Sequence, residues 1–201
     1  MVELLGDLER AEAKIARATA QATACWRAGW GGDEVLQTVP GVGPVIAATV
    51  RAWFGEATQF PGGSQAAAFV GLNPSNWESG LMASPSRPIT REGPPELRLA
   101  CYQAANIARR HDPQLAAFYW RLMVERRHNH VKATCAVARK LVTRIWATLS
   151  RGEPYEVRDV DGTTVDRATA TELAAKWAVP EDVRRRARAH SAACKRGRLS
   201  R

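Results

Sequence analysis

The chain has 201 residues, of which 45% are hydrophobic, so it is long and apolar enough for one or two domains with a packed core. Its formal net charge is +9 and its pI is about 10.0, which makes an acidic polymer the first partner to consider. Nucleic acid fits best, because Lys and Arg side chains that bind phosphates release counterions. A basic protein without such a partner is the alternative.

Two classes of protein are disfavoured by the same survey. No apolar run approaches the roughly 18 residues that a membrane-spanning helix needs, and residues 1–20 are too charged for a signal peptide. The four cysteines are scattered and form no CxxC pair, which argues against a zinc site. We therefore expect a protein of the reducing cytoplasm, with no membrane partner, no metal ligands and no cofactor of its own.

A long helix is predicted over residues 1–30. Its apolar residues recur in steps of four and three, as in a coiled-coil seam. The alternative is that this helix forms one arm of an intramolecular helical hairpin. The seam residues are Leu4, Leu8, Ala11, Ile15, Ala18, Ala22 and Cys25.

The stretch LQTVPGVGPVIAATVRAWFG, residues 36–55, resembles a helix-hairpin-helix motif. A short helix ends at Val39, a tight turn follows, and Pro44 suits the first position of the next helix. Glycines let a DNA backbone approach closely, and the N–H groups of the turn and of the helix start can face a phosphate. We therefore expect Gly41, Val42 and Gly43 to bind DNA without reading its sequence. A helical corner that binds no ligand is the alternative.

The remaining pattern predicts a mainly α fold. Helices are expected at 64–70 with Ser64 as N-cap, then at 96–110, 113–127, 129–150 and 168–178, with a small hairpin turning at Asp161-Gly162. From Arg184 the sequence is strongly basic, so we expect a disordered tail that contacts DNA non-specifically. We divide the chain into a coiled-coil-like helix at 1–30, a helix-hairpin-helix domain at 31–157, and an appendage with the tail at 158–201.

The stretch GLNPSNWESG, residues 71–80, opens a loop of about twenty-five residues, which is uncommon for an inert connection. The loop carries Ser79 and leads to Arg87, Arg91 and Arg98. Arginines can clamp a phosphate and stabilise the charge of a transition state, so the serine hydroxyl could attack phosphorus. Neither a hydrolase elbow around this serine nor a clustered carboxylate pattern is present in the sequence. The alternative is that Ser79-Gly80 only turns the chain.

The order of these motifs resembles the C-terminal domain of the DEDD-type insertion-sequence transposases, which are guided by a bridge RNA. The resemblance covers roughly residues 1–157. It is carried by VPGVGPVIAATV, GLNPSNWESG, PITREGPPELR and the late helix KATCAVARKLVTRIWATLSRGEPY. The family's GLxP element matches Gly71, Leu72 and Pro74, and its second element matches Ile89, Thr90, Gly93, Leu97 and Arg98. Arg91 replaces the usual lysine, and Pro94 replaces the usual asparagine and is followed by Pro95.

The resemblance implies that Ser79 is the nucleophile of DNA transposition and that Arg87, Arg91 and Arg98 bind the neighbouring DNA backbone. It implies DNA and a guide RNA as partners, a homo-oligomer, and a bacterial, nucleoid-associated protein. In the family, an N-terminal RuvC-like domain holds the catalytic Mg²⁺ with four acids. No such acids are found in this sequence, so we expect a truncated transposase that is inactive alone, with a non-catalytic DNA-binding module as the alternative.

Overall fold

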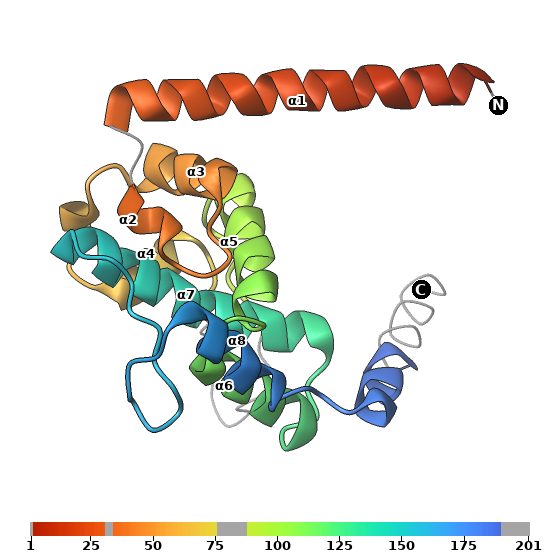
Figure 1. Cartoon of the computed structure of the whole chain (residues 1–201), viewed down its shortest axis with the longest axis vertical. Coiled ribbons are helices and arrows are strands. Elements are labelled where there is room, and N and C mark those ends of the chain that lie inside the picture. The colour runs from red at the N-terminus through yellow and green to blue at the C-terminus, as the bar shows by residue number, and fades with distance from the viewer. Residues whose placement is uncertain (1, 31–33, 76–87, 190–201) are drawn as a thin grey trace.

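The computed structural model describes residues 2–30, 34–75 and 88–189, and this part of the chain is mainly helical (Figure 1). Within it, the only β pairings are two isolated antiparallel bridges. The fold class predicted from the sequence is confirmed. The helices are α1 (Val2–Trp30), α2 (Glu34–Gln37), α3 (Pro44–Phe54), the 3-10 turn η1 (Ala57–Gln59), α4 (Gly63–Phe69), α5 (Pro95–Ala108), α6 (Pro113–Val124), α7 (His130–Arg151) and α8 (Arg167–Ala175).

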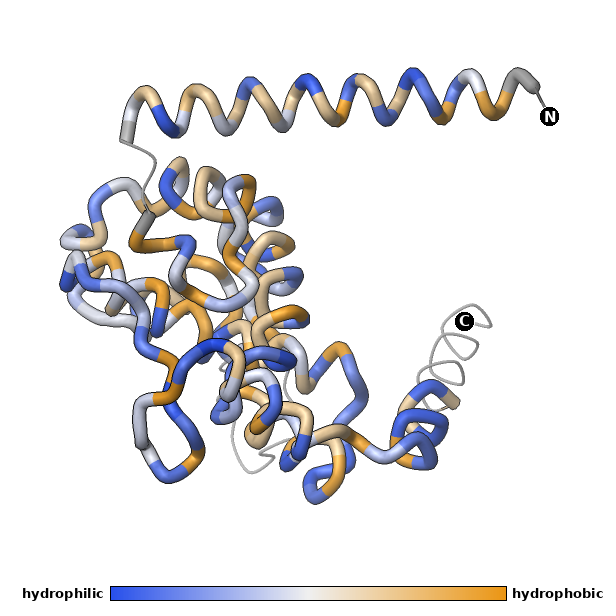
Figure 2. The backbone as a smooth tube through the Cα atoms, in the orientation of Figure 1, coloured by the Kyte–Doolittle hydropathy of each residue, from blue (hydrophilic) through white to orange (hydrophobic). Residues whose placement is uncertain are grey.

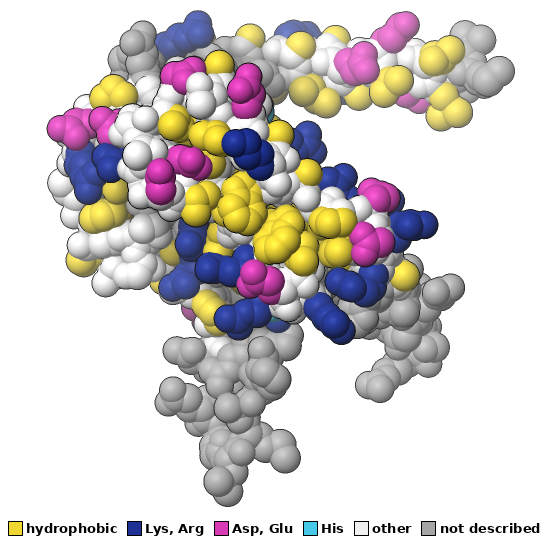
Figure 3. All heavy atoms as spheres, turned by 60° about the horizontal axis from the view of Figure 1, so that its bottom comes forward, with side chains coloured by type: hydrophobic (Ala, Val, Ile, Leu, Met, Phe, Trp, Pro, Cys, Tyr) yellow, Lys and Arg dark blue, Asp and Glu magenta, His cyan; other side chains and the backbone are white. Residues whose placement is uncertain are grey.

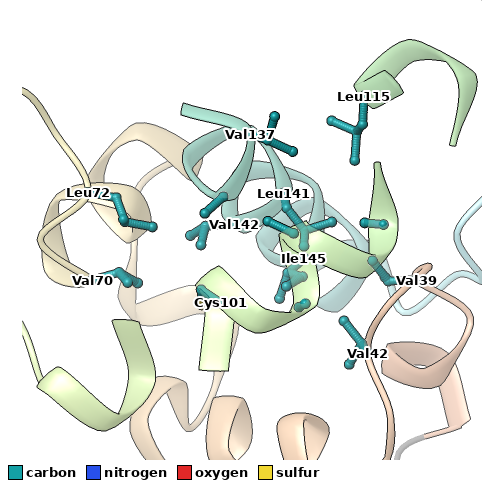
Figure 4. Close-up of a cluster of buried hydrophobic side chains, with 14 of the residues drawn as sticks. Val39, Val42, Val70, Leu72, Cys101, Leu115, Val137, Leu141, Val142 and Ile145 are labelled. Atoms are coloured by element: carbon teal, nitrogen blue, oxygen red, sulfur yellow. The ribbon is translucent and has the colours of Figure 1, made fainter. Parts of the chain in front are cut away.

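Helix α7 is the central element of the core. It packs against α5 and α4, and it also contacts α6 and α2. Its apolar residues recur at helical spacing, so Leu141, Val142 and Ile145 are all fully buried on one side. Figure 4 shows these side chains between those of α5, the hairpin and the residues around Leu72. The helix ends at Gly152, which adopts a left-handed conformation with φ of 67°.

A buried polar network fixes the corner between α6, α7 and the segment after α7. Asp112 is fully buried and caps α6 by accepting from the Leu115 N–H at 2.9 Å. Its second carboxylate oxygen accepts from Arg144 at 2.6 Å and from the Tyr155 hydroxyl at 2.6 Å. Arg144 also donates to Gln114 at 2.7 Å, and burial raises the pKa of Tyr155 above its ordinary value. The Asp112 carboxylate is therefore fully partnered.

Helix α1 lies beside the rest of the molecule and meets it mainly at its C-terminal end, where it contacts α3 and buries Trp26 (Figure 1). Its predicted seam is exposed: Leu4 keeps 73% of its surface accessible and Ile15 keeps 66%. Figure 2 shows hydrophobic and hydrophilic residues alternating along the whole of this helix. The described residues supply no second arm along its first half, so the intramolecular hairpin is not formed there.

Two local predictions were wrong. Ser64 does not cap α4, because the helix begins one residue earlier after Gly62, and the Ser64 hydroxyl instead donates to Gln65 at 2.8 Å. Residues 184–189 are not a disordered tail, because residues 181–189 are helical and Val183 is buried against the core. Apolar Val179, Val183 and Ala187 pack inwards while the arginines between them face out, which is an amphipathic pattern that the basic composition concealed. Residues 190–201 lie outside the described residues.

The region after residue 157 packs onto the helical domain. Arg158 and Thr164 form an isolated bridge around Gly162, whose φ is 94°, so the predicted turn is present without regular strands. Helix α8 follows with Asp166 as its N-cap and packs against α6.

Candidate nucleic-acid interface

The ends of the segment 76–87 are held together by backbone hydrogen bonds. Ser75 N–H donates to Pro88 O at 2.9 Å, and Thr90 N–H donates to Asn73 O at 2.9 Å. Pro74 and Ile89 form the isolated antiparallel bridge between these two bonds. We call residues 71–75 and 88–93 the neck of this segment. The predicted nucleophile Ser79 and the predicted DNA-binding Arg87 belong to the sequence between these two stretches and lie outside the described residues.

Two glycines allow the sides of the neck to meet. Gly71 has φ of 75°, and a Cβ there would lie 2.9 Å from the backbone nitrogens of Glu92 and Gly93. A Cβ on Gly93 would lie 1.8 Å from Phe69 O, at the end of α4. Neither position therefore accepts a side chain without movement of the backbone. The GLNP and TREG stretches, which are some twenty residues apart, are parts of one packed unit.

Arg98 lies in the first turn of α5 and is hydrogen-bonded to the neck. Its guanidinium donates to Gly93 O at 3.0 Å and to Val70 O at 3.3 Å, and the side chain is half-buried. These bonds tie the start of α5 to Gly93 on one side of the neck and to Val70, the residue directly before the other side. The predicted DNA contact of Arg98 stays a prediction, and the observed role of this guanidinium is to hold the neck on α5.

Two further arginines stand at the neck and are exposed. Arg91 has a positive φ of 60° and donates its N–H to Gly71 O at 3.2 Å, which leaves its side chain facing outward. Arg139 on α7 donates to the side-chain oxygen of Asn73 at 2.9 Å. Burial raises the pKa of Cys135 on α7, while the charges of Arg91 and Arg98 lower it, so both cations lie near this helix. Three arginines therefore lie at the neck: Arg91 within it, Arg98 on α5 and Arg139 on α7.

The turn at residues 40–43, which we predicted as part of a helix-hairpin-helix motif and call the hairpin, packs on α5 through Gly41. This glycine has φ of 83°, and a Cβ there would lie 2.3 Å from Ala104 O. Val42 is buried in the core, and its N–H donates to Val39 O at 3.1 Å. Val42 is thus occupied in holding the turn, and its predicted contact with DNA is not tested by the fold.

The turn leaves the start of α3 open. Gly43 is the N-cap of this helix, is exposed, and has no side chain to bond the first N–H groups, which lack partners within a helix. A cavity of about 360 Å³ lies beside it, lined by the turn, His111 and Arg167 among others. Arg167 donates to Thr38 O at 2.9 Å, which holds its positive charge against the hairpin. These groups together favour an anion at this place.

The histidines of the described region are engaged with neighbouring side chains or lie apart. His130 accepts or donates at 2.8 Å with the Tyr119 hydroxyl, and His111 pairs at 3.1 Å with the Thr171 hydroxyl. Among residues 2–30, 34–75 and 88–189, no three His, Cys, Asp or Glu side chains gather closely enough to hold a metal ion.

Comparison with known proteins assigns these residues to a protein family. Residues 33–120, which contain the hairpin, the neck and α5, match the Transposase IS116/IS110/IS902 family. This chain carries a transposase domain of that family. The two glycine-dependent features described above both fall inside the matched residues, so the transposase domain includes them.

Named relatives support the same assignment. The chain is 31% identical over 160 residues to the transposase for insertion sequence element IS1111A of Coxiella burnetii, covering 76% of this chain and 39% of that protein. It is 33% identical over 159 residues to a probable family 20 transposase of Pseudomonas aeruginosa, covering 76% of this chain and 45% of that protein. An IS110 protein of 43.6 kDa from Streptomyces coelicolor is 31% identical over 124 residues, covering 62% of this chain and 30% of that protein. The chain thus spans less than half of the length of these relatives.

Two arginines of the candidate interface could not be found from the sequence. Arg139 lies 66 residues from Asn73, and nothing in the helical pattern of α7 links the two. The predicted division places Arg167 in the appendage, yet this residue donates to Thr38 O beside the hairpin, 129 residues earlier in the chain. The exposed side of α7 was the only available signal for Arg139, because a basic residue opposite a buried stripe faces solvent.

No described helix is both long and apolar enough to cross a lipid bilayer.

Proposed function

We propose that this transposase domain binds DNA and that Ser79 attacks a DNA phosphodiester during transposition of an insertion sequence. The observation that supports this most strongly is the closed neck. It fixes both ends of the segment that carries Ser79 and surrounds its base with Arg91, Arg98 and Arg139. A serine carried there meets a phosphate in a positive field, which favours the doubly charged phosphorane-like transition state.

The chemical step is a transesterification. The Ser79 oxygen forms a bond to phosphorus, and the bond from phosphorus to one sugar oxygen breaks. The serine loses its proton to the surroundings, and the departing sugar oxygen gains one. Since one phosphoester bond replaces another, a sugar hydroxyl from a second DNA end can reverse the step and join the strands without an external energy source. Arg91 and Arg139 would hold the phosphate oxygens as the charge grows.

The hairpin would hold the duplex while this happens. The open start of α3 at Gly43 and the guanidinium of Arg167 suit a backbone phosphate, and the packed Gly41 keeps the turn rigid. Such contacts position the protein and carry no sequence information. Selection of the DNA site would then depend on the guide RNA that the resemblance implies.

The test is a search for a covalent protein–DNA adduct. The chain is joined to a RuvC-like domain, incubated with a nicked DNA substrate, denatured and resolved on a gel. We expect the adduct with the wild-type sequence and with Ser84→Ala, a matched control on the same segment, and none with Ser79→Ala. An adduct of equal yield with Ser79→Ala would refute the assignment of the nucleophile.

A second candidate function is non-catalytic DNA binding through the hairpin alone. The open N-terminus of α3 beside Arg167 favours it, because this grip needs neither Ser79 nor the neck. It predicts binding with a steep salt dependence and no adduct in any of the three proteins above. The two candidates thus give different results in the same experiment.

We further propose that α1 pairs with α1 of a second copy. Its exposed Leu4, Leu8 and Ile15 form a narrow apolar seam along a helix with no intramolecular cover on that side among the described residues. Sedimentation of Leu8→Lys together with Ile15→Lys tests this. A fall to the monomer mass is expected, and an unchanged oligomer mass would exclude the seam as the contact.

A further inference from the structure

A second basic site lies at the far end of α5 from the neck. The neck adjoins the N-terminus of α5, and the 14 residues of this helix separate the two places by about 20 Å. Here a cavity of about 790 Å³ opens between the end of α5, α6, the start of α7, α8 and the helical residues 181–189. Its volume falls within the range of about 300–1,000 Å³ that is typical of ligand sites. None of the groups used by the proposed transposition step lines it.

The cavity is strongly positive. Arg109, Arg110, Arg184 and Arg188 line it, and no Asp or Glu is found among the described residues of its lining. Glu181 approaches Arg184 at 3.9 Å and Arg188 at 3.5 Å, but all three side chains are exposed, so these pairs neutralise little. Burial and the charges of Arg110 and Arg184 lower the pKa of Arg109, as expected where cations face one another.

Arg109 is held in place without being neutralised. Its guanidinium lies over the Tyr119 ring, 4.3 Å from the centroid, and donates to Asn106 at 3.0 and 2.8 Å. Both partners are uncharged, so the full positive charge stays available to an anion. The N-terminus of α7 begins at His130 in the same lining and adds the positive end of a 22-residue helix.

The rest of the lining is apolar and aromatic. The Tyr119 ring and Trp177 lie in the wall, together with Met123 and Val179. Trp177 is supported from outside by Trp120, with ring centroids 5.6 Å apart, and Tyr119 is fixed by its bond to His130. Figure 3, in which the bottom of the view in Figure 1 comes forward, shows hydrophobic side chains gathered on that face with charged side chains of both signs around them. A ligand that matches both parts has a flat ring and a negative charge.

We propose that this cavity binds an unpaired nucleotide of a single-stranded nucleic acid, with its phosphate at Arg109, Arg110 and Arg184 and its base against the half-buried Trp177. Aromatic stacking and arginine contacts to the backbone are the usual means of holding single strands. The site is separate from Ser79, so it stands whether or not that serine is the nucleophile. An acidic peptide has the charge but lacks the ring that the aromatic wall accommodates.

The first test measures the affinity of the full chain for a fluorescein-labelled twelve-residue oligothymidylate. Arg110→Gln with Arg184→Gln should weaken binding about tenfold or more, because two charge-assisted contacts are lost. Arg17→Gln with Arg151→Gln removes the same charge from exposed sites outside the cavity and should change affinity about twofold or less. Circular dichroism melting of both variants confirms that they fold. Equal weakening by the two pairs would overturn the proposal, because it would mean that only net charge matters.

The second test locates the base. An oligothymidylate carrying 5-iodouracil is crosslinked by light to the wild-type chain, and the modified peptide is identified by mass spectrometry. Crosslinking at Trp177 is expected. Crosslinking confined to other aromatic residues such as Trp53, or displacement of the oligonucleotide by polyglutamate at equal charge concentration, would overturn it.

Discussion

The neck and the hairpin are both built on glycines that touch backbone, yet they leave their polar groups in different states. In the neck, backbone hydrogen bonds join the two sides, and Arg98 is bonded to the carbonyls of Val70 and Gly93. In the hairpin, Gly41 packs on α5 while the first N–H groups of α3 are left without a capping side chain. The polar groups of the neck are hydrogen-bonded to one another, whereas the first N–H groups of α3 after the hairpin are free to donate to an acceptor from outside the protein.

This difference suits the neck and the hairpin to different functions. A closed neck can hold a segment at a fixed place, which a reacting group requires, because small misplacements are costly in catalysis. An open helix start can hold any phosphate, which suits a grip on duplex DNA without regard to sequence. Substitutions in the neck should therefore affect adduct formation and stability, and substitutions in the hairpin should affect affinity.

The largest effect is expected for Gly93→Ala. The new methyl group would overlap Phe69 O, 1.8 Å away, so α4 and the neck must separate. We expect a loss of about 3 kcal/mol in the free energy of unfolding, measured in urea, and no covalent adduct. Gly62→Ala is the matched control, since its nearest neighbour is the movable end of Gln65. A Gly93→Ala protein with full stability and full adduct yield would show that adduct formation does not depend on the packing of the neck.

The next effect is expected for Gly41→Ala in the hairpin. Its φ of 83° disfavours alanine, and Ala104 O lies 2.3 Å from the added Cβ. The backbone strain and the steric overlap together should lower the free energy of unfolding by about 2 kcal/mol and weaken DNA binding. Gly43→Ala provides the control for stability, because its φ is −87° and nothing lies within 4 Å of a Cβ. Equal losses in the two variants would mean that the turn does not depend on its contact with α5.

The smallest effects are expected for two of the three arginines at the neck, Arg98 and Arg91. Arg98→Gln removes bonds to two carbonyls and should cost about 1–2 kcal/mol of stability, followed by thermal unfolding. Arg91→Gln removes an exposed side chain and should change stability by about 0.5 kcal/mol or less. Arg91→Gln should nevertheless weaken DNA binding and reduce the salt slope by about 1. An unchanged salt slope would remove Arg91 from the interface.

Much of the fold was predictable from periodicity and capping. The extents of α1, α3 and α7 follow from apolar spacing, Pro44 and the glycine after Arg151, because these signals act within one or two turns. The contacts that shape the candidate site were not predictable. The bond from Arg139 to Asn73 and the bond from Arg167 to Thr38 join distant parts of the chain.

Asp112 illustrates the same limit at one residue. The sequence placed it at a helix boundary before Pro113, and it is indeed the N-cap of α6. Its burial with Arg144 and Tyr155 depends on how α6 and α7 pack, which local patterns do not encode. The helical residues 184–189 were missed for a related reason. Their basic composition indicated disorder, while the burial of Val183 becomes visible only against its tertiary neighbours.

The most direct test of the central claim is to read the attachment site of the DNA. The adduct formed by the chain joined to a RuvC-like domain is digested with nuclease and protease, and the peptide that retains a nucleotide is sequenced by tandem mass spectrometry. We predict that the nucleotide is esterified to the hydroxyl of Ser79. A nucleotide on any other residue, or cleaved DNA with no protein attached, would contradict the account.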